Sequence, residues 1–123
     1  MYKRQHGVVA GDVLAAAGLE LPRLSEATTA ALCVHLPETA SVANPVDFAG
    51  GGEQGLVAYA DVGRLLLESG DVGAVLLTGY FGGYGVDTPA LAEEELAVAR
   101  SLASAAAETK GTLVVHTLSL IHI

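Results

Sequence analysis

In some stretches of the chain the apolar residues recur with the period of a helix. In others they form continuous apolar runs. In the first stretch the apolar residues repeat with the helical period: Val8, Val9, Val13, Leu14 and Ala17. This pattern predicts a helix over residues 8–17, ended by Gly18, because glycine readily adopts the left-handed turn that follows many helices. A short extended segment over residues 19–22 comes next. Ser25 then begins a second helix, which stops before Pro37.

Two continuous apolar runs later in the chain have the character of buried strands. Residues 73–80 read GAVLLTGY and residues 112–117 read TLVVHT. Runs rich in valine and leucine are typical of parallel strands that are covered on both faces. A third helix is predicted over residues 53–69, ahead of the first run. A long helix that begins at Thr88 and Pro89 separates the two runs.

This order of helices and strands predicts an α/β domain with a parallel sheet. We expect three main strands, near residues 19–22, 73–80 and 112–117. A doubly wound sheet normally begins on a central strand, whereas this chain opens on a helix, so we expect the first strand to be missing. A groove should then lie where that strand belongs, with an unpaired strand edge beside residues 73–80.

The two ends of the chain are compatible with one oligonucleotide read in opposite orientations. The codons CTG TCT CTT ATA CAC ATC encode residues 118–123, and their reverse complement contains GTG TAT AAG AGA CAG, which encodes residues 1–5 when GTG is a start codon. The oligonucleotide resembles a transposase end sequence used to prepare sequencing libraries. We therefore expect residues 1–5 and 118–123 to be cloning scars, and residues 6–117 to be a domain fragment from a longer reading frame.

Composition and charge narrow the function classes. Hydrophobic residues make up 51% of the chain and its mean hydropathy is +0.47, which suffices for a packed core. Without Lys3 and Arg4, four basic residues stand against fourteen acidic ones, a net charge of −10 that disfavours a nucleic-acid partner. No apolar run approaches the roughly 18 residues of a membrane span. The single cysteine, Cys33, fits a reducing cytoplasmic location, and we expect both Cys33 and His116 in the core.

Two glycine-rich turns are the features most suited to ligand binding. The first, NPVDFAGGGEQG, precedes a predicted helix, and the second, TGYFGGYGVD, follows a predicted strand. Ligands collect at the carboxyl ends of parallel strands, and helix N-termini bind phosphate through bare N–H groups and the helix dipole. Gly50, Gly51 and Gly52 would let a phosphate approach the backbone. The first turn is therefore a candidate anion cradle, with an ordinary structural turn as the alternative.

Several segments together resemble a known family. They are GVVAGDVLAAAGLELPRLSEATTAAL, ASVANPVDFAGGG, DVGAVLLTGYFGGYG, AEEELAVARSLA and LVVHTL. This series is similar to the flavodoxin-like ligase domain of NDP-forming acyl-CoA synthetases, a group that includes ADP-forming acetate–CoA ligase. It also resembles the C-terminal domain of the succinyl-CoA synthetase β subunit. The resemblance spans residues 6–117 and implies a flavodoxin-like three-layer fold, truncated at its first strand.

The resemblance also implies an activity and a division of labour. Enzymes of this family interconvert an acid, CoA and a nucleoside triphosphate with acyl-CoA, NDP and phosphate through a phosphohistidine. The domain would offer a helix N-terminus to a phosphohistidine carried by another domain, with no catalytic or metal-binding residue of its own. The residues that would shape the first turn are Asn44, Pro45 and Asp47. Gly50, Gly51 and Gly52 would contact phosphoryl oxygens, and Gly82 and Gly83 would keep the neighbouring strand end open.

The same resemblance places the cofactors and partners elsewhere. CoA, ATP or ADP, and Mg²⁺ are expected on CoA-binding and ATP-grasp domains or subunits, so the isolated fragment should be inactive. One alternative is a non-catalytic regulatory or interaction module, like the ligase-like region of a related protein acetyltransferase. Another is a stand-alone flavodoxin-like binder of flavin or nucleotide.

Overall fold

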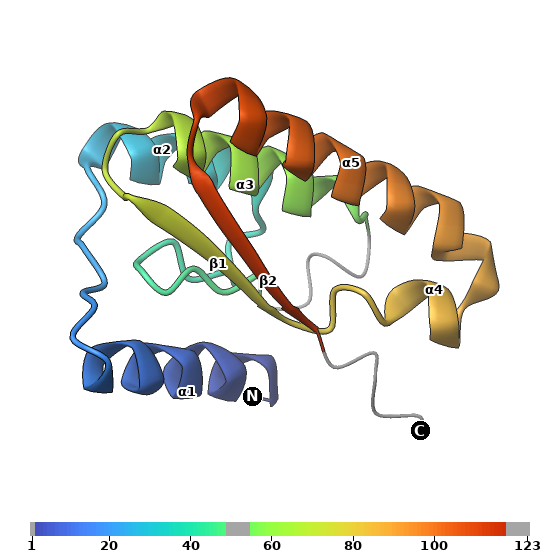
Figure 1. The fold of residues 1–123 in the computed structure, drawn as a ribbon, viewed down its shortest axis with the longest axis horizontal. Helices are drawn as coiled ribbons and strands as arrows, with labels where there is room; N and C mark the ends of the chain where they lie inside the picture. Colours follow the sequence, from blue (N-terminus) through green and yellow to red (C-terminus); the bar gives the residue numbers. More distant parts are fainter. Residues whose placement is uncertain (1, 49–54, 118–123) are drawn as a thin grey trace.

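The computed structural model describes residues 2–48 and 55–117, which form a mixed α/β fold with five α-helices and a two-stranded parallel sheet (Figure 1). The elements are α1 (Tyr2–Ala16), α2 (Glu26–His35), α3 (Val57–Glu68), β1 (Ala74–Gly79), α4 (Tyr84–Asp87), the 3₁₀ turn η2 (Pro89–Leu91), α5 (Ala92–Thr109) and β2 (Thr112–Thr117). The predicted α/β class with a parallel sheet is confirmed.

The sheet pairs β1 with β2 over their full lengths. The register runs from Ala74 opposite Thr112 to Gly79 opposite Thr117. Helices α2, α3 and α5 lie on one side of the two strands, and α1 lies on the other (Figure 1). Helix α1 runs antiparallel to β1, so its first turn lies toward the carboxyl end of the sheet.

Two apolar clusters hold the helices to the strands. The first joins α3, α5 and the segment after β1 through Leu56, Phe81, Tyr84, Val98 and Leu102. The second joins α2 to α3 through Leu24, Leu32, Leu36 and Val62. Helices α3 and α5 approach closely, because Gly63 faces Leu102: a Cβ added at Gly63 would lie 2.4 Å from the Leu102 Cδ2 atom.

The start of α2 is tied to the turn that precedes β1. Ser25 caps the helix as predicted, because its side chain accepts a hydrogen bond from the Thr28 N–H. The Asp71 carboxylate accepts hydrogen bonds from the Thr28 hydroxyl at 2.6 Å and from the Ser25 N–H at 3.0 Å. These two hydrogen bonds hold the pKa of Asp71 below its ordinary value of 3.8, and the bond from the Thr28 hydroxyl contributes more than the bond from the Ser25 N–H.

The structure corrects the prediction of a third strand. Residues 19–22 have no regular secondary structure and pair with no strand among the residues described, so the described sheet has two strands instead of three. A segment becomes a strand only where a neighbour supplies ladder hydrogen bonds, and in the described sheet neither β1 nor β2 pairs with this segment. The predicted strands over 73–80 and 112–117 are confirmed with slightly shorter or equal bounds.

Burial also differs from the prediction at several positions. The strands were expected to be covered on both faces, yet Leu76 is 36% exposed and Val114 is 52% exposed. Cys33 and His116 are exposed rather than buried in the core. Cys33 lies outside the inward face of α2, whose buried residues include Leu32. His116 lies on β2, which has β1 as its one partner strand in the described sheet.

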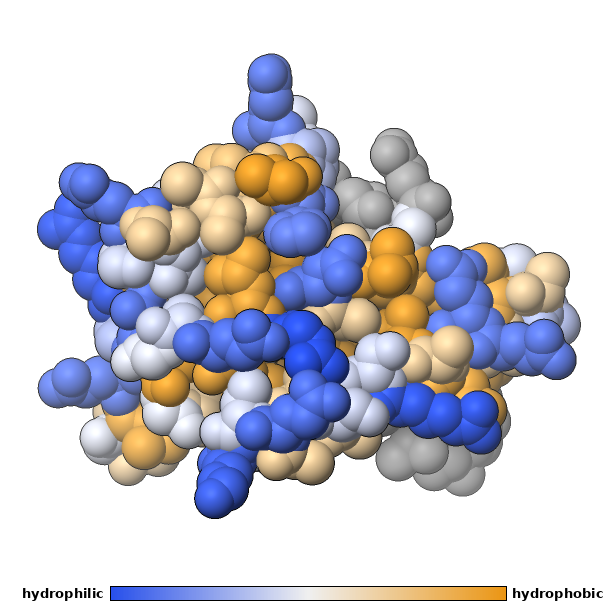
Figure 2. Space-filling model, turned by 90° about the horizontal axis from the view of Figure 1, so that it is seen from above, coloured by the Kyte–Doolittle hydropathy of each residue, from blue (hydrophilic) through white to orange (hydrophobic). Residues whose placement is uncertain are grey.

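The outer surface on the helix side of the molecule carries apolar residues in separate patches. Seen from above the view of Figure 1, these patches lie between charged and polar side chains (Figure 2). Val34 on α2 and Leu96 on α5 are among the exposed apolar residues of the chain, at 81% and 51%. Single exposed apolar residues of this kind are normal on protein surfaces.

Candidate functional site

The NPVD turn is closed by two backbone hydrogen bonds and attached to a neighbouring segment by one side-chain hydrogen bond. Ser41 and Asp47 exchange two backbone hydrogen bonds of 2.9 Å, which close the loop between them. The Asn44 side chain donates to the Pro22 carbonyl at 3.0 Å, and the Asn44–Pro45 peptide bond is cis. The loop is thereby attached to the segment between α1 and α2, so Asn44 has a clear structural role.

An aromatic cluster brings the two glycine-rich segments together. Phe48, which ends the described part of the first segment, stacks on Tyr59 of α3 with ring centroids 4.7 Å apart. Tyr59 in turn contacts Phe81 at 5.1 Å, and the Tyr59 and Tyr84 hydroxyls lie 2.8 Å apart. The sequence analysis associates both turns with ligand binding at the carboxyl ends of the strands. In the structure, Tyr59 contacts residues of both turns.

The second turn is organised around a carboxylate from α5. Glu95 is 9% exposed, and its Oε2 atom accepts hydrogen bonds from the N–H groups of Gly82 at 2.7 Å and Tyr84 at 3.1 Å. Its Oε1 atom accepts a third bond, from the Gly85 N–H at 3.0 Å. Gly82 has a φ of 98°, a conformation that favours glycine. The turn therefore forms a cluster of amide donors, and a side chain of the same chain occupies it.

Tight packing accounts for two other glycines of this turn. A Cβ at Gly83 would lie 3.2 Å from the Tyr80 carbonyl oxygen, and one at Gly85 would lie 2.8 Å from the Ala92 Cα atom. Gly83 is buried, and its N–H donates to the Tyr80 carbonyl at 2.8 Å. Gly85 permits the close approach of α4 to Ala92 of α5, and Gly83 lets the chain pass close to Tyr80. That Gly82 and Gly83 keep the strand end open for a ligand stays a prediction.

The glycines of the first turn lie outside the described residues. Gly50, Gly51 and Gly52, the predicted phosphate donors, fall between Phe48 and the start of α3 at Val57. Helix α3 begins later than the predicted residue 53 and carries no side-chain cap at Leu56. The role of the three glycines therefore stays a prediction.

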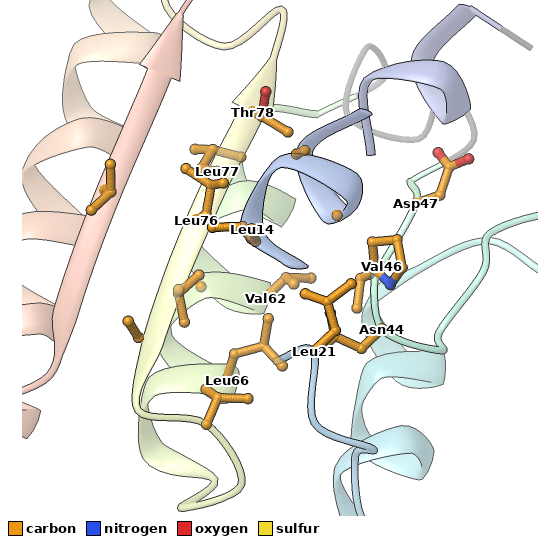
Figure 3. A pocket seen from close by; sticks show the side chains of 18 of the residues that line it. Leu14, Leu21, Asn44, Val46, Asp47, Val62, Leu66, Leu76, Leu77 and Thr78 are labelled. Atoms are coloured by element: carbon orange, nitrogen blue, oxygen red, sulfur yellow. The ribbon is translucent and has the colours of Figure 1, made fainter. Parts of the chain in front are cut away.

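An apolar groove runs along β1. Its volume is about 800 Å³. The walls come from α1, the segments 19–24 and 41–48, α3 and the whole of β1, together with Leu102 of α5 and Leu113 and Val114 of β2 (Figure 3). Leu14 of α1 lies beside Leu76, Val62 and Leu66 of α3 lie along the groove, and Asp47 and Thr78 lie toward the same end of it (Figure 3). The predicted groove beside residues 73–80 is present.

Comparison with known proteins adds no family to this picture. No family model, curated protein or solved structure matches the chain. Within residues 2–48 and 55–117, histidine, cysteine and acidic side chains form no group of three that could hold a metal ion. Among the helices described, none combines the length and apolar character that a membrane crossing requires.

Two residues of this region were not singled out by sequence reasoning. Glu95 follows Glu93 and Glu94 in the first turn of α5, but it alone of the three is buried. The position of Glu95 in the sequence could have predicted its burial, because it lies three residues before Val98 on the inward face of α5. Tyr59 carried no such signal beyond its place on the apolar face of α3.

Proposed function

We propose that this chain is the flavodoxin-like ligase domain of an NDP-forming acyl-CoA synthetase. The proposal rests on the family resemblance of the sequence. One observation supports it beyond the sequence: the two glycine-rich segments that carry the resemblance are joined by the stacking of Phe48, Tyr59 and Phe81. In an α/β fold, such a position at the end of a strand is the usual place for a ligand.

In this proposal the first turn alone contacts the phosphoryl group. Asn44, Pro45 and Asp47 set the path of the chain into α3, and Gly50 to Gly52 offer backbone N–H groups. The second turn adds no donor from Gly82, Tyr84 or Gly85, because the Glu95 carboxylate already accepts their hydrogen bonds. Gly82 and Gly83 then act by shaping the strand end.

The phosphohistidine, CoA, the nucleotide and Mg²⁺ belong to other domains or subunits in this proposal. A single exposed helix N-terminus stabilises an anion by only about 0.3–1 kcal/mol. Phosphate affinity of this chain alone should therefore be weaker than about 1 mM, and a second helix end from a partner domain is needed. The isolated chain should have no ligase activity.

Amide chemical shifts of the ¹⁵N-labelled chain, titrated with a phosphohistidine peptide and with inorganic phosphate, test the site. We expect weak, saturable shifts at Phe48 and at the first turn of α3, and none at Gly82, Tyr84 or Gly85. Shifts confined to the opposite end of the sheet would reject the site. Tight flavin or nucleotide binding would favour the stand-alone binder instead.

The activity is tested in an intact protein that carries this domain. Sequencing the reading frame around residues 6–117 should reveal an ATP-grasp segment and a histidine loop. Gly51→Val should then reduce histidine phosphorylation from labelled nucleotide and leave CoA binding unchanged, since a branched side chain would hold the phosphoryl group off the backbone. An acetyltransferase domain without a histidine loop would favour the non-catalytic interaction module.

A further inference from the structure

Tyr59 of α3 contacts two segments that are far apart in the sequence: the NPVD turn, here residues 41–48, and the second turn, residues 78–87. Phe48 of the NPVD turn stacks on the Tyr59 ring, with the ring centroids 4.7 Å apart. Phe81 of the second turn contacts the same ring at a centroid distance of 5.1 Å. One aromatic ring therefore takes part in the packing of both segments.

The same contacts connect the two apolar clusters of the fold. Phe48 packs against the cluster between α2 and α3, whereas Tyr59 packs against the cluster that contains Phe81 and Tyr84. Phe81 and Tyr84 are buried, and the Tyr84 hydroxyl lies 2.8 Å from the Tyr59 hydroxyl. If the second turn moves away from α3, Tyr59 loses both its ring contact and its hydroxyl contact, which hold its ring beneath Phe48.

Each segment also has hydrogen-bonded N–H groups whose opening can be followed. The N–H groups of Ser41 and Asp47 donate to each other's carbonyl oxygens at 2.9 Å and close the NPVD turn. The second turn has three N–H groups that donate to the Glu95 carboxylate, those of Gly82, Tyr84 and Gly85. Exchange of these hydrogens with solvent reports how often each segment opens.

We propose that the NPVD turn and the second turn open as one cooperative unit, with Tyr59 as the residue that couples them. Local openings follow packed units of structure and cost less free energy than global unfolding. A ligand that orders either segment then also reduces the opening of the other, without changing its closed structure. Because ligands of α/β folds collect at the carboxyl ends of strands, the coupling acts where a ligand is expected. The proposal is independent of the proposed ligase function.

Amide hydrogen exchange of the full chain, measured by NMR, tests the coupling. Glu95→Gln weakens hydrogen bonds of the second turn alone. Exchange should nevertheless become about tenfold faster both in the second turn and at Ser41 and Asp47. The matched control is Asp71→Asn, which weakens hydrogen bonds at the start of α2 instead. It should change exchange in both segments by less than about twofold.

Substitution of Tyr59 provides the second arm. In a Tyr59→Leu background, Glu95→Gln should speed exchange in the second turn alone, because the coupling ring is absent. Tyr59→Phe keeps the ring, so in that background Glu95→Gln should still speed exchange in the NPVD turn. Should Tyr59→Leu not fold, the comparison of Glu95→Gln with Asp71→Asn still decides whether the segments open together. Unchanged exchange at Ser41 and Asp47 in Glu95→Gln, equal acceleration in Asp71→Asn, or coupling that persists in Tyr59→Leu would each overturn the proposal.

Discussion

Removing the Glu95 carboxylate should destabilise the protein far more than removing either of the acidic side chains that precede it on α5. In Glu95→Ala, three backbone N–H groups of the turn after β1 lose their acceptor, and the turn is packed under α5. A hydrogen bond to a charged group contributes about 1.5–3 kcal/mol, and an unsatisfied buried donor costs about 1–3 kcal/mol.

The three contributions are not additive, because the Gly82 and Gly85 donors are only partly buried and water can reach them after the change. We therefore expect a loss of about 3–4 kcal/mol in the free energy of unfolding, against the 5–15 kcal/mol typical of a domain. At this chain length the melting temperature should fall by about 10–15 °C. Glu95→Gln should lose about half as much, since one amide oxygen can still accept.

Urea denaturation and amide exchange at Gly82, Tyr84 and Gly85 measure the effect. The matched control is Glu94→Ala, because Glu94 is the preceding residue of α5 and is exposed. Its effect should stay within about 0.5 kcal/mol. If Glu95→Ala and Glu94→Ala have the same unfolding midpoint, the carboxylate does not hold the turn and the interpretation of this region is wrong.

Two further changes test the packing and the polar clamp. Gly63→Ala should lower the free energy of unfolding, measured by urea denaturation, by about 1–2 kcal/mol because its Cβ meets Leu102. Gly73→Ala is the control and should be close to neutral, since there is open space around its Cβ. Equal effects would contradict the close approach of α3 and α5. Asp71→Asn should be less stable than the parent above about pH 4, and the difference in the free energy of unfolding should shrink on acidification. The reason is that the pKa of Asp71 is lowered in the fold, so its carboxylate stabilises the fold only while it is ionised. A difference that stays constant from pH 6 to pH 2 would exclude the hydrogen bond from Thr28 as its cause.

Local pattern was enough to predict the main elements. The apolar run at 73–80 contains β1, the run at 112–117 became β2, and Ser25 caps α2 as its residue type predicts. These features depend on side-chain period and capping chemistry, which neighbours in sequence decide. A groove beside residues 73–80 was also expected, and a groove lined by Val72 to Tyr80 is present.

Tertiary contact decided the rest. Residues 19–22 have a strand-like sequence, but no strand of the described sheet pairs with them, so they form no strand. Glu95 has the same composition signal as Glu93 and Glu94, yet only the packing of α5 over the turn after β1 turns it into the acceptor of three N–H groups. The two glycine-rich segments are far apart in the sequence, and it is the stacking around Tyr59 that joins them. Pairing of this kind depends on which faces meet in space, and a residue's own sequence neighbours do not specify that.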